Sequence, residues 1–181
     1  MRRIASRVGC TATSLYLYFK NKDDLLISVF EDRMESILEF LKSALAEEDA
    51  APGRLRRFIE LHLGLVQRDR ALAEVLAVEL RQSAKFVREY KARKFYEYLT
   101  VAEDILNEGI SEGIFRSGIN PKIYRRALFG ALDEISVMWV TSIREGIEPD
   151  YLLSDAVEDV YNLFLTGLRP RATEQMNRSD L

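Results

Sequence analysis

Apolar residues recur at helical spacing along almost the whole chain. They follow one another at intervals of three and four residues within the segments 26–45, 54–68, 83–110 and 150–168. Such spacing gives a helix one apolar stripe, whereas a half-buried strand alternates apolar and polar residues over roughly four to eight positions. No segment of the sequence shows that alternation convincingly. The sequence therefore predicts an all-α fold whose helices bury their stripes against one another.

Caps and helix-breaking residues divide this pattern into helices. Asn21 can cap a long helix over about residues 23–46, whose first turn places two aspartates at the positive end of the helix dipole. Asn120 followed by Pro121 is a typical helix start. The other helices are expected over about residues 54–68, 72–80, 83–110, 120–145 and 150–168.

Three segments are predicted to be non-helical. Residues 47–53 combine an acidic cluster with a proline and a glycine, which is typical of a linker. Gly113 and Gly118 can adopt the left-handed conformation that ends a helix. Residues 169–181 are polar and aperiodic, so we expect a flexible tail.

The first 26 residues predict two short helices joined by a tight turn. Gly9 is placed to end the first helix with a positive φ angle, and Thr11 can cap a second helix over about residues 12–20. Leu15 and Phe19, four residues apart, would face inward on that helix. This arrangement is a helix-turn-helix, whose second helix enters the major groove of DNA.

Positive charge is concentrated in the same segment. The chain has a net charge of −3, yet residues 1–22 contain five Lys or Arg and no Asp or Glu. The other 159 residues therefore carry a net charge of −8. A basic end on an acidic body is the electrostatic pattern expected of a DNA-contacting unit.

One cysteine and one histidine leave little scope for metal or redox chemistry. Cys10 alone excludes an intrachain disulfide, and with a single histidine it makes a metal site implausible. We interpret Cys10 as a small buried apolar residue rather than a redox switch, and His62 as a core histidine with a satisfied hydrogen bond. The sequence offers no convergent acid, base or nucleophile set and no Gly-rich phosphate loop, so we expect neither an enzyme nor a bound cofactor.

The sequence also lacks membrane and export signals. It has no apolar run of roughly 18 residues and no signal-peptide pattern at its N-terminus. Together with cysteine usage that fits a reducing compartment, this predicts a cytoplasmic protein without a membrane partner.

The run "IASRVGCTATSLYLYFKNKDDLL" resembles the TetR family of tetracycline-repressor-like regulators. The end of the family pattern, L-Y-x-Y-F-x-[NS]-K-[DE]-x-L, is matched from Leu15 to Leu25. The resemblance implies a dimeric, ligand-responsive repressor. It would have a helix-turn-helix unit in residues 1–26, joined by the helix 23–46 to a helical ligand-binding and dimerisation domain in residues 47–168.

The same resemblance implies a set of DNA contacts around the second helix. Thr13 and Ser14 would approach base edges or phosphates, and Lys22 would hold a phosphate, because phosphate contacts set the register while few side chains read the sequence. The full set of candidates is Thr11, Thr13, Ser14, Tyr16, Tyr18, Lys20 and Lys22. Ala12 departs from the family, where lysine is frequent at this position.

Family members also carry an amphipathic helix before the position of Ile4, where this chain has Met1. Three explanations stay open: a start assigned too far downstream, a chain given without its first residues, or a real loss of the helix. We expect the 181-residue form, with this truncated helix-turn-helix, to bind operator DNA poorly and an extended form to bind it. The alternative function is a ligand-binding dimer that has lost operator binding.

A ligand site is expected in the middle of the chain. Residues 80–99 mix basic and aromatic side chains, which suits either a solvated charged face or a basic entrance to an apolar tunnel. With "GALDEISVMWV", this segment resembles the fatty-acid-degradation regulators of the TetR family, which sense long-chain acyl-CoA. That resemblance implies ligand contacts by Arg81, Lys85, Arg88, Phe95, Leu99, Leu128 and Trp139.

The last two helices predict a homodimer interface. Residues 121–145 and 150–168 contain more large apolar side chains than one helix face needs, and two such helix pairs can form a self-complementary four-helix contact. Packing within a single chain is the alternative explanation. The residues concerned are Phe129, Leu132, Ile135, Met138, Trp139, Tyr161, Phe164 and Leu168.

Overall fold

The computed structural model describes residues 1–75 and 93–170, and all regular structure in these two ranges is helical. The all-α prediction is confirmed. In chain order the helices are α1 (Arg2–Arg7), α2 (Ala12–Tyr18), α3 (Lys22–Leu45), α4 (Ala51–Arg68), α5 (Arg70–Glu74), α8 (Arg93–Ser111), α9 (Pro121–Arg144) and α10 (Leu153–Leu168).

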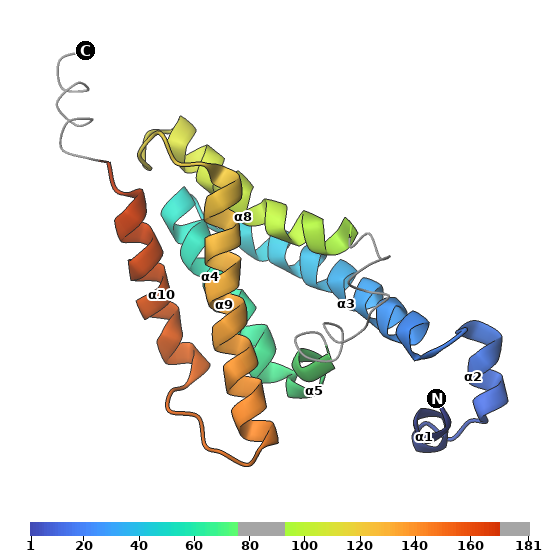
Figure 1. The fold of residues 1–181 in the computed structure, drawn as a ribbon. Helices are drawn as coiled ribbons and strands as arrows, with labels where there is room; N and C mark the ends of the chain where they lie inside the picture. The colour runs from blue at the N-terminus through green and yellow to red at the C-terminus, as the bar shows by residue number, and fades with distance from the viewer. Residues whose placement is uncertain (76–92, 171–181) are drawn as a thin grey trace, which may run out of the picture.

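The helices α1 and α2 lie at one end of the molecule, where the long helix α3 connects them to the other helices (Figure 1). Gly9, with φ of 74°, turns the chain between them as predicted. The Thr11 hydroxyl accepts a hydrogen bond from the backbone N–H of Ser14 at 3.1 Å, and the Asn21 side chain accepts one from Asp24 at 2.9 Å. Both predicted caps are therefore confirmed, and they fix where α2 and α3 begin.

The helix α4 is the centre of the remaining structure, in contact with α3, α8, α9 and α10 (Figure 1). Its side chains Leu55, Phe58, Ile59 and Leu63 are at most 1% exposed. Burying a side chain of this size stabilises a fold by about 1.5–3 kcal/mol. The apolar stripe read from the sequence thus explains why this helix holds the others together.

Two predicted boundaries were wrong, both at helix starts. The helix α4 begins at Ala51, so Pro52 and Gly53 lie in its first turn rather than in a linker. Proline is tolerated there because the first helical N–H groups have no partner within the helix. The last helix begins at Leu153, three residues later than predicted. The predicted helical residues 76–80 and 83–92 lie outside the described residues.

The connection between α8 and α9 depends on a close contact between Gly109 and Phe115. The Phe115 ring is 3% exposed, and a Cβ atom at Gly109 would lie 2.2 Å from it. Gly113 and Gly118 have φ angles of 70° and 77°, as predicted. The Asn120 side chain then accepts a hydrogen bond from Lys122 N–H at 3.0 Å and opens α9. This turn sets how α9 returns across α8 to form one wall of the site.

Candidate functional site

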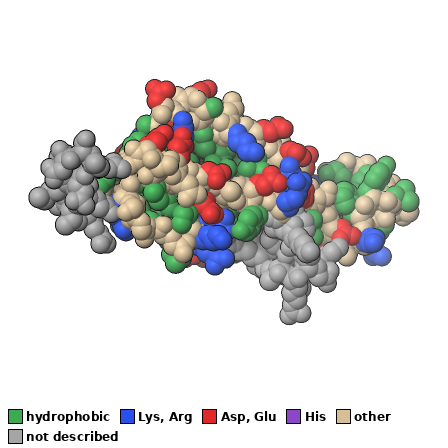
Figure 2. Space-filling model, turned by 90° about the horizontal axis from the view of Figure 1, so that it is seen from above, with side chains coloured by type: hydrophobic (Ala, Val, Ile, Leu, Met, Phe, Trp, Pro, Cys, Tyr) green, Lys and Arg blue, Asp and Glu red, His purple; other side chains and the backbone are tan. Residues whose placement is uncertain are grey.

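The helix α2 presents its outer side to solvent. Tyr16, Leu17 and Tyr18 are exposed to 54%, 79% and 80%, and Thr13 and Lys20 are also exposed. Figure 2 shows apolar side chains gathered on this N-terminal unit at one end of the molecule. Leu15 and Phe19 are half-buried on the opposite side of the helix. The arrangement is that of a reading helix, while the individual DNA contacts stay a prediction.

The other predicted DNA-contacting residues flank this helix. Thr11 and Lys22 are exposed, and Ser14 is half-buried with its hydroxyl 2.9 Å from that of Thr11. The prediction of a buried Cys10 was wrong, since its side chain is exposed. Cys10 lies in the turn rather than on a helix stripe, and its backbone N–H bonds to the Ala5 carbonyl at 3.0 Å.

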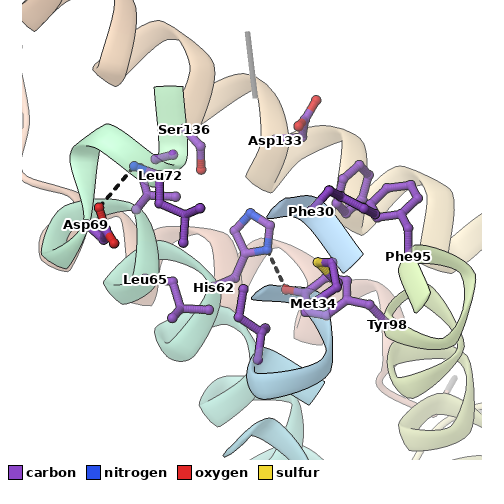
Figure 3. Close-up of a pocket in the computed structure, with 14 residues that line it drawn as sticks. Phe30, Met34, His62, Leu65, Asp69, Leu72, Phe95, Tyr98, Asp133 and Ser136 are labelled. Carbon is purple, nitrogen blue, oxygen red and sulfur yellow. Dashed lines mark hydrogen bonds between the residues drawn. The ribbon is translucent and has the colours of Figure 1, made fainter. Parts of the chain in front are cut away.

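A cavity of about 350 Å³ lies among α3, α4, α5, α8 and α9 (Figure 3). Its apolar lining residues are Phe30, Met34, Ile37, Leu65, Val66, Leu72, Ala73, Phe95 and Phe129. Its polar lining residues are His62, Asp69, Tyr98, Asp133 and Ser136. Cavities of roughly 300–1,000 Å³ with a mainly apolar lining and a few polar groups are typical small-molecule sites.

Local sequence features explain the walls of the cavity. Phe30, Met34 and Ile37 share one face of α3 because they are spaced by four and three residues. Asp69 ends α4 and caps α5 by accepting a hydrogen bond from Leu72 N–H at 3.0 Å, so the chain turns at the cavity. The Ser136 hydroxyl donates to the Leu132 carbonyl at 2.7 Å and is satisfied within α9.

His62 and Tyr98 form a hydrogen-bonded pair within this lining. The Nδ1 atom of His62 lies 2.6 Å from the Tyr98 hydroxyl, and the His62 ring also meets the Phe129 ring edge-on at 5.9 Å. Burial lowers the pKa of His62 to about 4 and raises the pKa of Tyr98, so both groups are neutral at pH 7. The predicted hydrogen bond of His62 is confirmed. Its position on a cavity was missed.

Of the predicted ligand-binding residues, Phe95 lines the cavity. Leu128 and Trp139 are buried in the hydrophobic core and Leu99 packs against it, and none of the three borders the cavity. A ligand role for these three stays a prediction. Arg81, Lys85 and Arg88 lie outside the described residues.

Part of the apolar surplus on α9 and α10 is used within the chain. Leu132, Trp139 and Leu168 are buried in the hydrophobic core, and Phe129 borders the cavity. These four were therefore wrongly expected to be available at an interface. Met138 is exposed, whereas the other predicted interface residues are half-buried: Ile135, Tyr161 and Phe164.

Two family models match this chain along nearly its whole length. The model described as bacterial regulatory proteins of the tetR family matches residues 1–29, and the model described as the C-terminal region of YsiA-like proteins matches residues 30–167. The chain belongs to the TetR family. It is a ligand-responsive transcriptional regulator, of the kind that acts as a dimer on operator DNA.

Relatives of known role lie in fatty acid metabolism. The fatty acid metabolism regulator protein of Bacillus subtilis is 32% identical over 166 residues, which are 92% of this chain and 83% of that protein. The structure of FadR from Bacillus subtilis in complex with stearoyl-CoA has a TM-score of 0.81 at 32% identity, covering 92% of this chain and 87% of that chain. FadR from Bacillus halodurans has the same TM-score and identity, covering 93% and 84%.

Within residues 1–75 and 93–170, no helix is long and apolar enough to cross a membrane. The same ranges contain no group of three or more His, Cys, Asp or Glu side chains that could hold a metal ion.

Proposed function

We propose that this regulator is released from operator DNA by a long-chain acyl-CoA whose acyl chain occupies the cavity. The observation that carries the proposal is the position of the cavity against α3. Phe30 and Met34 of this helix line the cavity, and the same helix begins at Lys22, directly after the reading helix. A ligand in the cavity therefore touches the element that carries the DNA-contacting unit.

The lining suits an alkyl chain. Nine of the fourteen lining residues are apolar, and Phe30, Phe95 and Phe129 form a continuous aromatic wall with ring centroids 6.3 and 5.0 Å apart. Each methylene group moved from water into such a site contributes about 0.8 kcal/mol. The stearoyl-CoA complex of the Bacillus subtilis protein, at the same fold, supports this class of ligand.

The proposal assigns the charged coenzyme to the basic residues of the middle segment. Arg81, Lys85 and Arg88 were expected at a basic entrance, where guanidinium and ammonium groups would meet phosphate oxygens. These residues lie outside the described ranges, so their role rests on the sequence alone.

Release would follow from a change in the distance between two reading helices. Dimeric helix-turn-helix proteins bind half-sites about 34–36 Å apart, so a small displacement of each unit breaks the fit. A ligand that fits the cavity only when α3 is displaced would shift the equilibrium toward the released state, in proportion to its preference for that state.

The dimer contact is assigned to the outer faces of α9 and α10. Ile123, Met138 and Leu163 are 67%, 52% and 71% exposed, which leaves apolar surface on both helices without cover from the described residues. Gly130 lies in the middle of α9 with open space around it, although glycine destabilises a helix by about 1 kcal/mol relative to alanine. Close approach of a second helix would account for its presence.

DNA release is the test of this function. Labelled DNA selected by the protein from a random pool is titrated with the protein, and fluorescence anisotropy is followed with stearoyl-CoA, free CoA or no addition. We expect stearoyl-CoA to weaken binding at least about tenfold, equal to about 1.4 kcal/mol, and free CoA to have no effect. DNA binding that is insensitive to every acyl-CoA would overturn the proposal.

The same titration separates the two functions considered for the sequence. It is run with the 181-residue chain and with N-terminally extended versions. Tight binding of stearoyl-CoA without DNA binding by any version would support the alternative, a ligand-binding dimer without operator binding.

A further inference from the structure

The pair of His62 and Tyr98 leaves one polar atom directed into the cavity. The Nδ1 atom of the imidazole is bonded to the Tyr98 hydroxyl at 2.6 Å. Figure 3 shows the other ring nitrogen, Nε2, on the opposite side of the ring, facing the part of the cavity that Ser136 and Asp133 border. Within the described residues, Nε2 has no hydrogen-bond partner.

Hydrogen-bond satisfaction decides which nitrogen carries the proton. If Nδ1–H donated to Tyr98, the tyrosine O–H and the Nε2 lone pair would both lack a partner, because no other group in the described residues bonds to either. If the tyrosine O–H donates to Nδ1, only one group is left, the Nε2–H donor. Unpaired buried polar groups are costly, so the second arrangement is favoured.

The cavity therefore holds a single neutral donor in a mainly apolar wall. Burial keeps the ring uncharged at pH 7, because the pKa of His62 is lowered to about 4. The Ser136 hydroxyl is already bonded to Leu132, and Asp69 accepts from Leu72, so neither competes for the proton of Nε2. A plain alkyl chain beside His62 would bury this donor without a partner.

We propose that the Nε2–H of His62 donates a hydrogen bond to an uncharged carbonyl oxygen of the bound acyl group, the thioester carbonyl of an acyl-CoA. Tyr98 is the positioning residue that fixes the tautomer. A carbonyl needs one donor, whereas a carboxylate would lose its hydration for the same single neutral contact. This inference rests on the proposed acyl-CoA function and adds to it the atom that recognises the acyl group.

The first test needs no variant, because His62 is the only histidine in the chain. Labelling with 15N-histidine reports this ring alone. We expect the free protein to show the Nε2–H tautomer, and the Nε2 proton signal to move downfield with stearoyl-CoA. The thioether analogue octadecyl-CoA, in which a methylene replaces the carbonyl, should not cause that shift. An Nδ1–H tautomer, or the same shift with both ligands, would overturn the inference.

The second test measures affinity by calorimetry. The wild-type protein should bind stearoyl-CoA about tenfold more tightly than octadecyl-CoA, equal to about 1.4 kcal/mol. The double variant His62→Phe with Tyr98→Phe removes both partners and leaves no orphaned group, so the fold is retained and the preference is lost. His62→Gln, which keeps an N–H donor of similar reach, should restore part of it.

The outcomes separate this inference from the proposed function. If stearoyl-CoA and octadecyl-CoA bind the wild-type protein equally, only the role of His62 is overturned. If the double variant unfolds at the wild-type temperature and keeps the tenfold preference, the carbonyl is recognised elsewhere. If neither ligand binds, both the proposed function and the inference fail.

Discussion

Phe30 of α3 and Phe95 of α8 lie with ring centroids 6.3 Å apart and planes inclined by 59°, and both side chains line the cavity. The contact joins the helix that leads to the DNA-contacting unit with the helix that holds Tyr98. It places the ligand site and the lever of the regulator on the same side chains. A ligand cannot fill this cavity without contacting both helices.

Filling the cavity with a side chain should block the ligand. Met34 is 5% exposed and lines the cavity, so Met34→Trp introduces an indole where the acyl chain is proposed to lie. We expect stearoyl-CoA affinity to fall at least about tenfold, with a cost in stability of about 1–3 kcal/mol from overpacking. Calorimetry and urea unfolding measure the two effects. Phe40→Trp, an exposed position on the same helix, is the control and should change neither.

The stability of the protein should depend on pH through His62. Its pKa is lowered to about 4 in the folded state, against about 6.5 when unfolded, so the unfolded state binds more protons between these values. The free energy of unfolding should therefore fall as the pH drops from about 6.5 to 4, by roughly 3 kcal/mol for this group. Urea unfolding across that range measures it, and the double variant with Phe at positions 62 and 98 should lose this part of the slope. An identical slope in both proteins would contradict the assignment.

Arg125 is expected to be the most costly charged residue to remove. Its guanidinium is buried, donates to Glu103 at 2.6 Å and to the Tyr96 hydroxyl at 3.0 Å, and lies 4.7 Å from the Tyr96 ring centre. Arg125→Met should destabilise the protein by about 3–5 kcal/mol, because it leaves a half-buried carboxylate without its partner.

A double variant and a surface pair serve as controls for this loss. Arg125→Met with Glu103→Gln should recover a large part of it. Arg56 and Glu158, which bond between exposed positions on α4 and α10, should contribute only about 0.2–1 kcal/mol. Equal losses for the buried and exposed pairs in urea unfolding would show that burial does not decide the cost.

Charge on the outer face of α9 and α10 should dissociate the dimer. Met138→Glu and Leu163→Glu place carboxylates on exposed apolar positions of the proposed contact, where they would be buried on both sides of the two-fold axis. Sedimentation velocity should give a monomer for the double variant and a dimer for Phe40→Glu on α3. A dimer that survives in the double variant places the contact on other helices.

The features that could be predicted from the sequence are those determined by neighbouring residues. Thr11, Asn21 and Asn120 cap helices through hydrogen bonds to backbone N–H groups two or three residues away, so their role follows from the local sequence. The positive φ angles of Gly9 and Gly118 follow in the same way. The linker prediction failed at Pro52 because a first helical turn accepts proline as readily as a loop does.

The position of the cavity depends on contacts between distant segments. Leu128 and Phe129 are adjacent on α9, yet Leu128 is fully buried and Phe129 borders the cavity. An apolar stripe does not tell these two environments apart, because the difference lies in where α5 and α8 stop covering α9. His62 likewise found its partner 36 residues away in Tyr98. The spacing of Phe30, Met34 and Ile37 on α3 was the available signal for the missed wall.

The central claim is that the cavity holds an acyl chain, and calorimetry with free CoA, octanoyl-CoA, lauroyl-CoA and stearoyl-CoA tests it most directly. With about 0.8 kcal/mol available for each buried methylene, affinity should rise by at least about tenfold from octanoyl-CoA to stearoyl-CoA, and free CoA should not bind measurably. Met34→Trp should lose this dependence on chain length. Equal affinity for all four ligands, or a chain-length dependence unchanged in Met34→Trp, would contradict an acyl chain in this cavity.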